Sequence, residues 1–265
     1  MSLTGFDTPF YIRRKRNLYA IQFLMYLDGR YSGLSTWTDS EDTDVDATNN
    51  GAQLAPYGYI FDGVDDYVTD TLGVNGETIT QFTMAAVITR NENSNNEGII
   101  QNAFGNNFRP RIYFVGTTLT AEVQIDNVTR TVTVANVGSY IKPGQPAFIV
   151  FRGDVTTGIE VLIDGVSRGT DSNTGTLFGA TGAGNFNLGK DANLSYFQKG
   201  ATRLVAICAS KMTNDQLTAW RAQLEYEGFF AIWRDNFAKW SGEEEFSSGV
   251  VDVSGSPYVT TLVES

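Results

Sequence analysis

The sequence has no histidine and a single cysteine, and these two scarcities exclude several kinds of catalytic site, metal site and disulfide. Without histidine the chain cannot build a Ser-His-Asp or Cys-His nucleophile, and it lacks the usual ligand of catalytic zinc. One cysteine, Cys208, cannot form a disulfide within the chain, and its apolar setting LVAICAS is typical of a buried, inert thiol. We therefore expect the protein not to be an enzyme.

Long apolar runs and a positive balance of charge are also lacking. No apolar run reaches the roughly 18 residues of a membrane-spanning helix, so we expect no membrane insertion. The net charge of −11 disfavours nucleic acid as a partner, because phosphate binding needs clustered Lys and Arg. The 42% of hydrophobic residues is nevertheless enough for an ordinary globular core.

Proline is rare and glycine is frequent, with 6 and 27 residues, and the glycines punctuate short strands between about residues 55 and 210. The stretch LTAEVQID (119–126) alternates apolar and polar residues, which is typical of a half-buried strand. AFIVF (147–151) is continuously apolar and suits a strand buried on both faces. Asp164-Gly165 predicts a hairpin turn. The pattern predicts an antiparallel sandwich or barrel.

A helix is expected only late in the chain. Thr213 and Gln216 form the Thr-x-x-Gln pattern of a capping box, and Gly228 is a suitable stop. The apolar residues between them fall on one helical face: Leu217, Trp220 and Leu224.

Residues 227–265 form an extension beyond the predicted sandwich. A second helix is expected within FFAIWRDNFAKW, followed by one or two strands or an extended tail. This extension concentrates more apolar surface than a cap needs, so we predict assembly contacts at its aromatic residues: Phe229, Phe230, Trp233, Phe237 and Trp240.

Residues 1–34 are predicted to be an arm or a first strand. They contain a basic run within an otherwise acidic chain: Arg13, Arg14, Lys15 and Arg16. Such a run can bind nucleic acid, but docking onto an acidic neighbour, including another copy of this chain, suits the overall charge better. We therefore predict assembly contacts here too.

Several segments, taken in order, resemble the concanavalin A-like, laminin-G-like jelly-roll domain over residues 35–224. They are STWTDSEDTDVDATNN, YIFDGVDDYVT, ITQFTMAAVITR, PAFIVFRGDVTTGIEVLIDGVSRGT and FNLGKDANLSYFQKGATRLVAICASKMTNDQLTAW. The resemblance implies an all-β antiparallel sandwich with a short C-terminal helical extension, in which Phe61 and Tyr67 face the core. Ala201-Thr202-Arg203 departs from the family's Ile-Asp-Glu.

The resemblance also implies a function. Lectin-like domains with additional arms are similar to bacteriophage virion proteins, either capsid decoration or tail proteins, assembled in the host cytoplasm. We therefore expect a structural protein that binds other virion proteins and itself, with a homotrimer as the predicted oligomer. A free glycan-binding module is the alternative, and a glycoside hydrolase is a third.

Glycan binding by such sandwiches uses polar loops and a stacking aromatic ring. The candidate ligand-binding residues are Asn93, Asn95, Asn96, Asn106, Asn107, Phe108 and Tyr196. Ordinary turn composition explains the same asparagines, so both interpretations stay open.

Two acidic clusters are candidate metal sites, and no cofactor other than calcium is suggested. Asp42, Asp44 and Asp46 have the alternate spacing of a calcium loop, but an EF-hand needs Gly and Glu where Ala47 and Gln53 stand. The second cluster is Asp62, Asp65 and Asp66, where the sequence Asp-Gly predicts a tight turn.

Two pairs of carboxylates are candidates for glycoside hydrolysis. Glu122 with Asp126, and Glu160 with Asp164, share strand faces. Four strand residues span about 13 Å, which exceeds the roughly 5 to 9.5 Å that glycoside hydrolysis requires.

Overall fold

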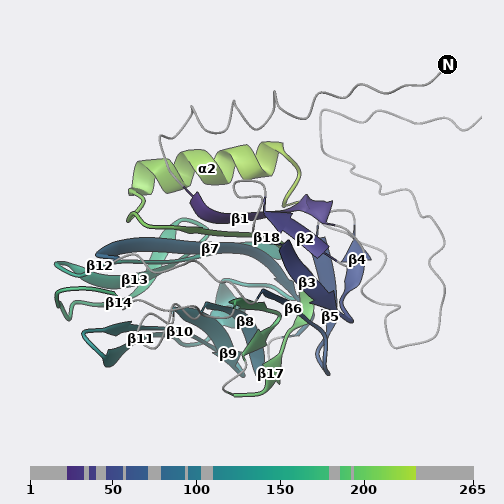
Figure 1. Cartoon of the computed structure of the whole chain (residues 1–265), viewed down its shortest axis with the longest axis horizontal. Helices are drawn as coiled ribbons and strands as arrows, with labels where there is room; N and C mark the ends of the chain where they lie inside the picture. The colour runs from purple at the N-terminus through teal and green to yellow at the C-terminus, as the bar shows by residue number, and fades with distance from the viewer. Residues whose placement is uncertain are drawn as a thin grey trace, which may run out of the picture. The chain divides into compact units, whose positions relative to one another are not determined.

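The computed structural model in Figure 1 describes most of residues 23–230. The described ranges are 23–32, 36–39, 46–55, 58–70, 79–92, 95–102, 110–178, 186–191 and 194–230. The chain divides into two compact units, Met1–Ala231 and Ile232–Ser265, and all described residues belong to the first. The basic run at residues 13–16 and the second helix expected from residue 231 onward lie outside the described residues.

Short strands dominate the described residues. The first nine are β1 (Phe23–Ser32), β2 (Thr36–Asp39), β3 (Asp46–Asn50), β4 (Gln53–Ala55), β5 (Gly58–Asp62), β6 (Tyr67–Asp70), β7 (Gln81–Arg90), β8 (Glu97–Asn102) and β9 (Arg111–Val115). The next five are β10 (Thr118–Ile125), β11 (Val128–Val134), β12 (Pro146–Asp154), β13 (Gly158–Ile163) and β14 (Val166–Asp171). The last are β15 (Phe186–Leu188), β16 (Lys190–Asp191), β17 (Tyr196–Phe197) and β18 (Lys199–Cys208). A 3-10 turn, η1 (Val137–Ser139), and one helix, α2 (Asn214–Tyr226), complete the described elements.

The strands form two antiparallel sheets packed as a sandwich. The first sheet runs β14-β13-β12-β7-β18-β1, with β5 also paired to β18 and β4 to β5. The second sheet runs β11-β10-β9-β8-β15-β6-β3, and β2 joins the two because it pairs with both β1 and β3. The predicted all-β sandwich with a short C-terminal helix is confirmed.

The main core lies between the two sheets and follows the predicted alternation. On β10 the apolar residues of the alternating stretch point inward and are at most 1% exposed: Leu119, Ala121, Val123 and Ile125. On β11 the same alternation buries Val132 and Val134. Because strand side chains alternate between faces, the intervening residues of both strands must point away from the core.

A second apolar layer lies on the outer face of the first sheet, under α2 (Figure 1). The helix contributes Leu217, Trp220 and Leu224, as predicted from their spacing. Its N-terminus carries the predicted capping box between Thr213 and Gln216. Strand β12 is therefore buried on both faces, which confirms the prediction for AFIVF.

Two predicted turns are confirmed by their backbone geometry. Asp164 and Gly165 both have positive φ, 51° and 81°, as a tight hairpin between β13 and β14 requires. At the Asp62-Gly63 turn, the Asp62 carboxylate accepts a hydrogen bond from the Val64 amide at 2.7 Å, and Gly63 has a φ of 86°. The helix ends before Gly228, whose φ is 87°.

Within the segment expected to be an arm or a first strand, residues 23–32 form strand β1, which pairs with β18 in the first sheet. One expectation from the sequence needs correction. Phe61 faces the core as expected, but Tyr67 is only half-buried. The alternation of β6 places Val68 inward instead, with 0% exposure. The described helix is not long and apolar enough to cross a membrane.

Candidate functional site

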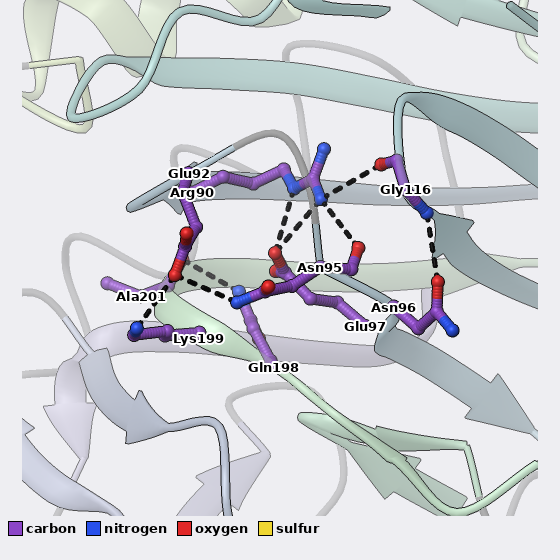
Figure 2. A network of polar contacts seen from close by, with 9 residues as sticks. All are labelled: Arg90, Glu92, Asn95, Asn96, Glu97, Gly116, Gln198, Lys199 and Ala201. Carbon is purple, nitrogen blue, oxygen red and sulfur yellow. Dashed lines mark hydrogen bonds and ion pairs between the residues drawn. The ribbon is translucent and has the colours of Figure 1, made fainter.

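The short connection between β7 and β8, residues 91–96, contains three of the candidate ligand-binding asparagines. Asn95 donates a hydrogen bond from its side chain to Glu92 Oε1 at 2.9 Å, while its backbone carbonyl accepts from Arg90 Nη2 at 3.2 Å (Figure 2). The side-chain oxygen of Asn96 accepts from the Gly116 amide at 3.0 Å. Asn93 lies outside the described residues. The connection is thus tied to the turn between β9 and β10.

A fully buried ion pair supports this connection from below. Arg90 ends β7 and Glu97 begins β8, and both side chains are 0% exposed. The guanidinium donates to Glu97 Oε1 from Nε at 3.1 Å and from Nη2 at 2.9 Å, as Figure 2 shows. It also lies over the Phe114 ring, 3.8 Å from the ring centre. Arg90 therefore joins two strands and two turns through one side chain.

Glu97 is electrostatically unusual. Burial raises the pKa of Glu97 to about 7, and the Arg90 guanidinium opposes the rise without cancelling it. A carboxyl with such a pKa is what a general acid needs. Glu97 has no exposed surface, however, so a substrate cannot touch it. We interpret the pair as support for the connection, and no local sequence pattern points to it.

Polar side chains form a continuous row on the outer face of the second sheet. Each is the register partner of the next, across seven strands: Thr131, Glu122, Arg111, Gln101, Asn187, Thr69 and Thr48. Several are hydrogen-bonded to their neighbours, with Thr69 Oγ1 3.2 Å from Asn187 Oδ1 and Arg111 Nη2 2.6 Å from Glu122 Oε2. The ends of the row are exposed, whereas Gln101 near its middle is 4% exposed.

The hairpin of β16 and β17 lies against the start of β8. A Cβ atom on Gly98 would be 1.9 Å from the Asp191 backbone nitrogen and 2.8 Å from the Tyr196 carbonyl oxygen. The hairpin is held from below, since Arg111 Nη1 is 3.1 Å from Asp191 Oδ2. Tyr196, a candidate ligand-binding residue, is half-buried there. It thus lies at the same end of β8 as Asn95 and Asn96.

The candidate residues Asn106, Asn107 and Phe108 lie outside the described residues. Among the candidate ligand-binding residues that the structure describes, Asn95, Asn96 and Tyr196 lie at the same end of β8.

A comparison of sequence families decides what kind of domain this is. The family Laminin_G_3, described as the concanavalin A-like lectin/glucanases superfamily, matches residues 62–218. The chain belongs to this superfamily. The match lies within the range expected from the motifs. No curated protein sequence matches the chain.

Solved structures of similar fold are distant in sequence. The binding domain of botulinum neurotoxin DC, in complex with SialylT, has a TM-score of 0.59 at 13% identity, covering 77% of this chain and 52% of that one. A structure of botulinum neurotoxin type C, whose cell entry depends on interaction with two ganglioside molecules, has a TM-score of 0.60 at 14% identity, covering 79% of this chain and 53% of that one. Trypanosoma rangeli sialidase has a TM-score of 0.55 at 12% identity, covering 78% of this chain and 33% of that one. This superfamily member spans about half or less of the length of these chains.

In this superfamily member, the carboxylates that are candidates for hydrolysis form ion pairs or hydrogen bonds with basic or hydroxyl side chains. Glu160 pairs with Arg152 at 2.6 Å. Glu122 accepts from Arg111 and from the Tyr113 hydroxyl, the latter at 2.7 Å. Asp126 accepts from the amide and hydroxyl of Thr176, which lowers its pKa. Neither of the two same-strand pairs offers a free acid and a free base.

The second acidic cluster is compact but serves the turn. Oxygen atoms of Asp62, Asp65 and Asp66 lie within 4.8 Å of one another, close enough to share a cation. Asp66 is 7% exposed, and its Oδ2 accepts from the Asp62 amide at 3.0 Å. Two of the three carboxylates thus already bind backbone amides, as a tight turn requires. In the first cluster, Asp42 and Asp44 lie outside the described residues, and only the backbone of Asp46, in β3, is described.

Of the predicted assembly residues, the structure describes two. Phe229 is 0% exposed and packs in the layer under α2, and its carbonyl accepts from Arg203 Nη1 at 2.7 Å. It therefore offers no surface to a partner. Phe230 is partly buried, with the Arg221 guanidinium 5.0 Å from its ring centre. Trp233, Phe237 and Trp240 lie outside the described residues.

Proposed function

We propose that the chain is a non-catalytic carbohydrate-binding protein. The observation that carries this proposal is the lectin-type sandwich with a row of polar side chains on the outer face of its second sheet. Hydroxyl, amide and guanidinium groups in such a row suit the hydroxyls of a sugar. Glu122, Asp126 and Glu160 are held by Arg or turn contacts, which argues against hydrolysis by these carboxylates. No cofactor is needed for this function.

The binding surface that we propose lies at the start of β8, on the strand that the row crosses further along, at Gln101. The Asn96 side chain is exposed, and the Tyr196 ring is half-buried. An amide donor and an aromatic ring are the usual elements of a sugar site, since the ring packs against the apolar face of the sugar. Two of the structural neighbours are described with SialylT or gangliosides, which makes sialylated glycans the first class to test.

Replacing Tyr196 with Ala should abolish glycan binding. On a glycan array, we expect the full chain to bind a defined set of glycans and the variant to lose at least about tenfold in signal, because the stacking ring is lost. Tyr226→Ala is the matched control, since Tyr226 is 83% exposed on α2, which covers the other sheet. A chain that binds no glycan, or a Tyr196 variant that binds like the wild type, would contradict the proposal.

We further propose that the protein is a component of a bacteriophage virion, either capsid decoration or tail. The supporting observation is the charge asymmetry of the chain, which has a basic run at residues 13–16 and a net charge of −11. A basic arm can dock onto an acidic neighbour, including a second copy, and a homotrimer is the oligomer we propose. A free lectin without such an assembly is the alternative.

Deleting residues 1–22 tests the virion proposal while leaving β1 intact. We expect light scattering to give a defined oligomer for the full chain and a folded monomer for the truncated chain. The truncated chain should also fail to join particles. Equal masses for the two forms would favour a free glycan-binding module instead.

A further inference from the structure

The ammonium group of Lys190 lies against two aromatic rings on the outer face of the second sheet. Its Nζ atom is 4.4 Å from the centre of the Tyr67 ring and 5.3 Å from the centre of the Phe197 ring. Both distances are within the roughly 6 Å at which a cation is attracted to the face of an aromatic ring. All three side chains are half-buried, so the ammonium group is held in place while it keeps contact with solvent.

The hairpin of β16 and β17 gives the ammonium group its position. Lys190 and Phe197 are register partners in this hairpin, and the next pair is Asp191 with Tyr196. Because successive strand residues point to opposite sides, the two pairs point away from each other. Lys190 contacts β6, whereas Asp191 forms an ion pair with β9. The Lys190 ammonium therefore lies on the β6 side of the hairpin, and Tyr196 points to the other side.

The Lys190 ammonium has no oxygen partner in the part of the chain that the structure describes. The other lysines described there each donate to an oxygen atom, at 2.7 to 2.9 Å: Lys142, Lys199 and Lys211. An ammonium group carries three N–H donors, and aromatic rings attract it without offering an oxygen acceptor. Lys190 thus has donors available for a ligand. In a chain with a net charge of −11, it gives an anionic ligand a local point of attraction.

The polar row of the second sheet begins beside this ammonium group. Tyr67 and Thr69 are two residues apart on β6, so their side chains lie on the same face, about 7 Å apart. Thr69 Oγ1 is 3.2 Å from Oδ1 of Asn187, which precedes Lys190 by three residues. A sugar that covers this area can therefore meet hydroxyl and amide groups of the row and the Lys190 cation at the same time.

We infer that Lys190 is a specificity-determining residue that binds the anionic group of an acidic glycan, either a carboxylate or a sulfate. Tyr67 and Phe197 fix the ammonium group before the ligand arrives, which reduces the ordering cost of binding. The ammonium then forms charge-assisted hydrogen bonds, which are about twice as strong as neutral ones. This inference rests on the proposed carbohydrate-binding function and adds a charge requirement to it.

A glycan array with matched pairs tests the inference on the full chain. Each sialylated, uronic-acid or sulfated glycan is placed beside its neutral parent. We expect signals about 10- to 100-fold higher for the acidic members, because hydrogen bonds to charged groups are strong. Lys190→Met should lose this preference and still bind the neutral parents, since methionine keeps an apolar chain against the two rings but carries no charge. The acidic members that lose signal show whether the anionic group is a carboxylate or a sulfate.

Two further variants separate charge from structure. Lys190→Arg keeps a cation that also stacks on aromatic rings, so it should keep the preference. Lys211→Met removes the same charge in the connection between β18 and α2 and should change nothing.

Equal binding of acidic and neutral members by the wild type, or a preference that persists in Lys190→Met, would overturn the inference while carbohydrate binding stands. The wild-type comparison needs no variant, so it decides even if Lys190→Met does not fold. If no glycan binds at all, the proposed function fails and the inference fails with it.

Discussion

Replacing Arg90 with Ala should lower the free energy of unfolding by about 3–5 kcal/mol at pH 8, one of the two largest effects expected in this chain. The substitution leaves the Glu97 carboxylate in a fully buried place with no cation beside it. It also removes the donor to the carbonyls of Asn95 and Gly116 and the contact with the Phe114 ring. Urea unfolding at fixed pH measures the loss.

The cost should depend on pH. At pH 5.5 Glu97 is protonated in the folded protein, because burial raises its pKa to about 7, so removing Arg90 no longer leaves a buried charge. We therefore expect a smaller loss at pH 5.5 than at pH 8. Lys199→Ala is the control. The side chains of Lys199 and its ion-pair partner Glu92 are 43% and 41% exposed, and exposed ion pairs contribute about 0–1 kcal/mol to stability.

A double replacement separates charge from packing. Arg90→Met with Glu97→Leu removes both charges and keeps most of the volume, and such changes are often neutral or stabilising. If the double variant is as unstable as Arg90→Ala, the loss comes from the hydrogen bonds to the two turns. A loss below about 1 kcal/mol for Arg90→Ala at pH 8 would contradict the burial of the pair.

Much of the fold was predictable because its signals are local. Alternation of polar and apolar residues placed the inward face of β10, and the continuous run in β12 indicated burial on both faces. The capping box at Thr213 and the spacing of the following apolar residues predicted where the helix begins and which of its faces is buried. Asp164-Gly165 gave a hairpin because both positions need positive φ. Each of these patterns acts within a few residues.

The candidate site was less predictable because it depends on register between distant strands. The polar row joins residues from seven strands, and no local pattern shows that Asn187 lies beside Gln101. Glu97 stands next to Asn95 and Asn96 in a polar stretch of the sequence, yet its side chain is 0% exposed and pairs with Arg90 at the end of β7.

The second large effect concerns the apolar layer under α2. Trp220→Ala should lower the free energy of unfolding by about 3–5 kcal/mol, because a large buried side chain is replaced by a cavity. Trp220 is 3% exposed and meets the Phe148 ring edge to face, with ring centres 5.3 Å apart, and Tyr26 at 6.3 Å. It therefore connects α2 to β12 and to β1 at once.

The matched control on the same helix is Tyr226→Ala, which removes an 83% exposed ring and should change stability by at most about 0.5 kcal/mol. Denaturant unfolding of both variants gives the comparison, and far-ultraviolet circular dichroism shows whether the helix persists. A loss below about 1 kcal/mol for Trp220→Ala would mean that the helix is not anchored through this layer. A large loss would place α2 within the folding unit of the sandwich, because the first sheet would then need the helix to cover its outer apolar face.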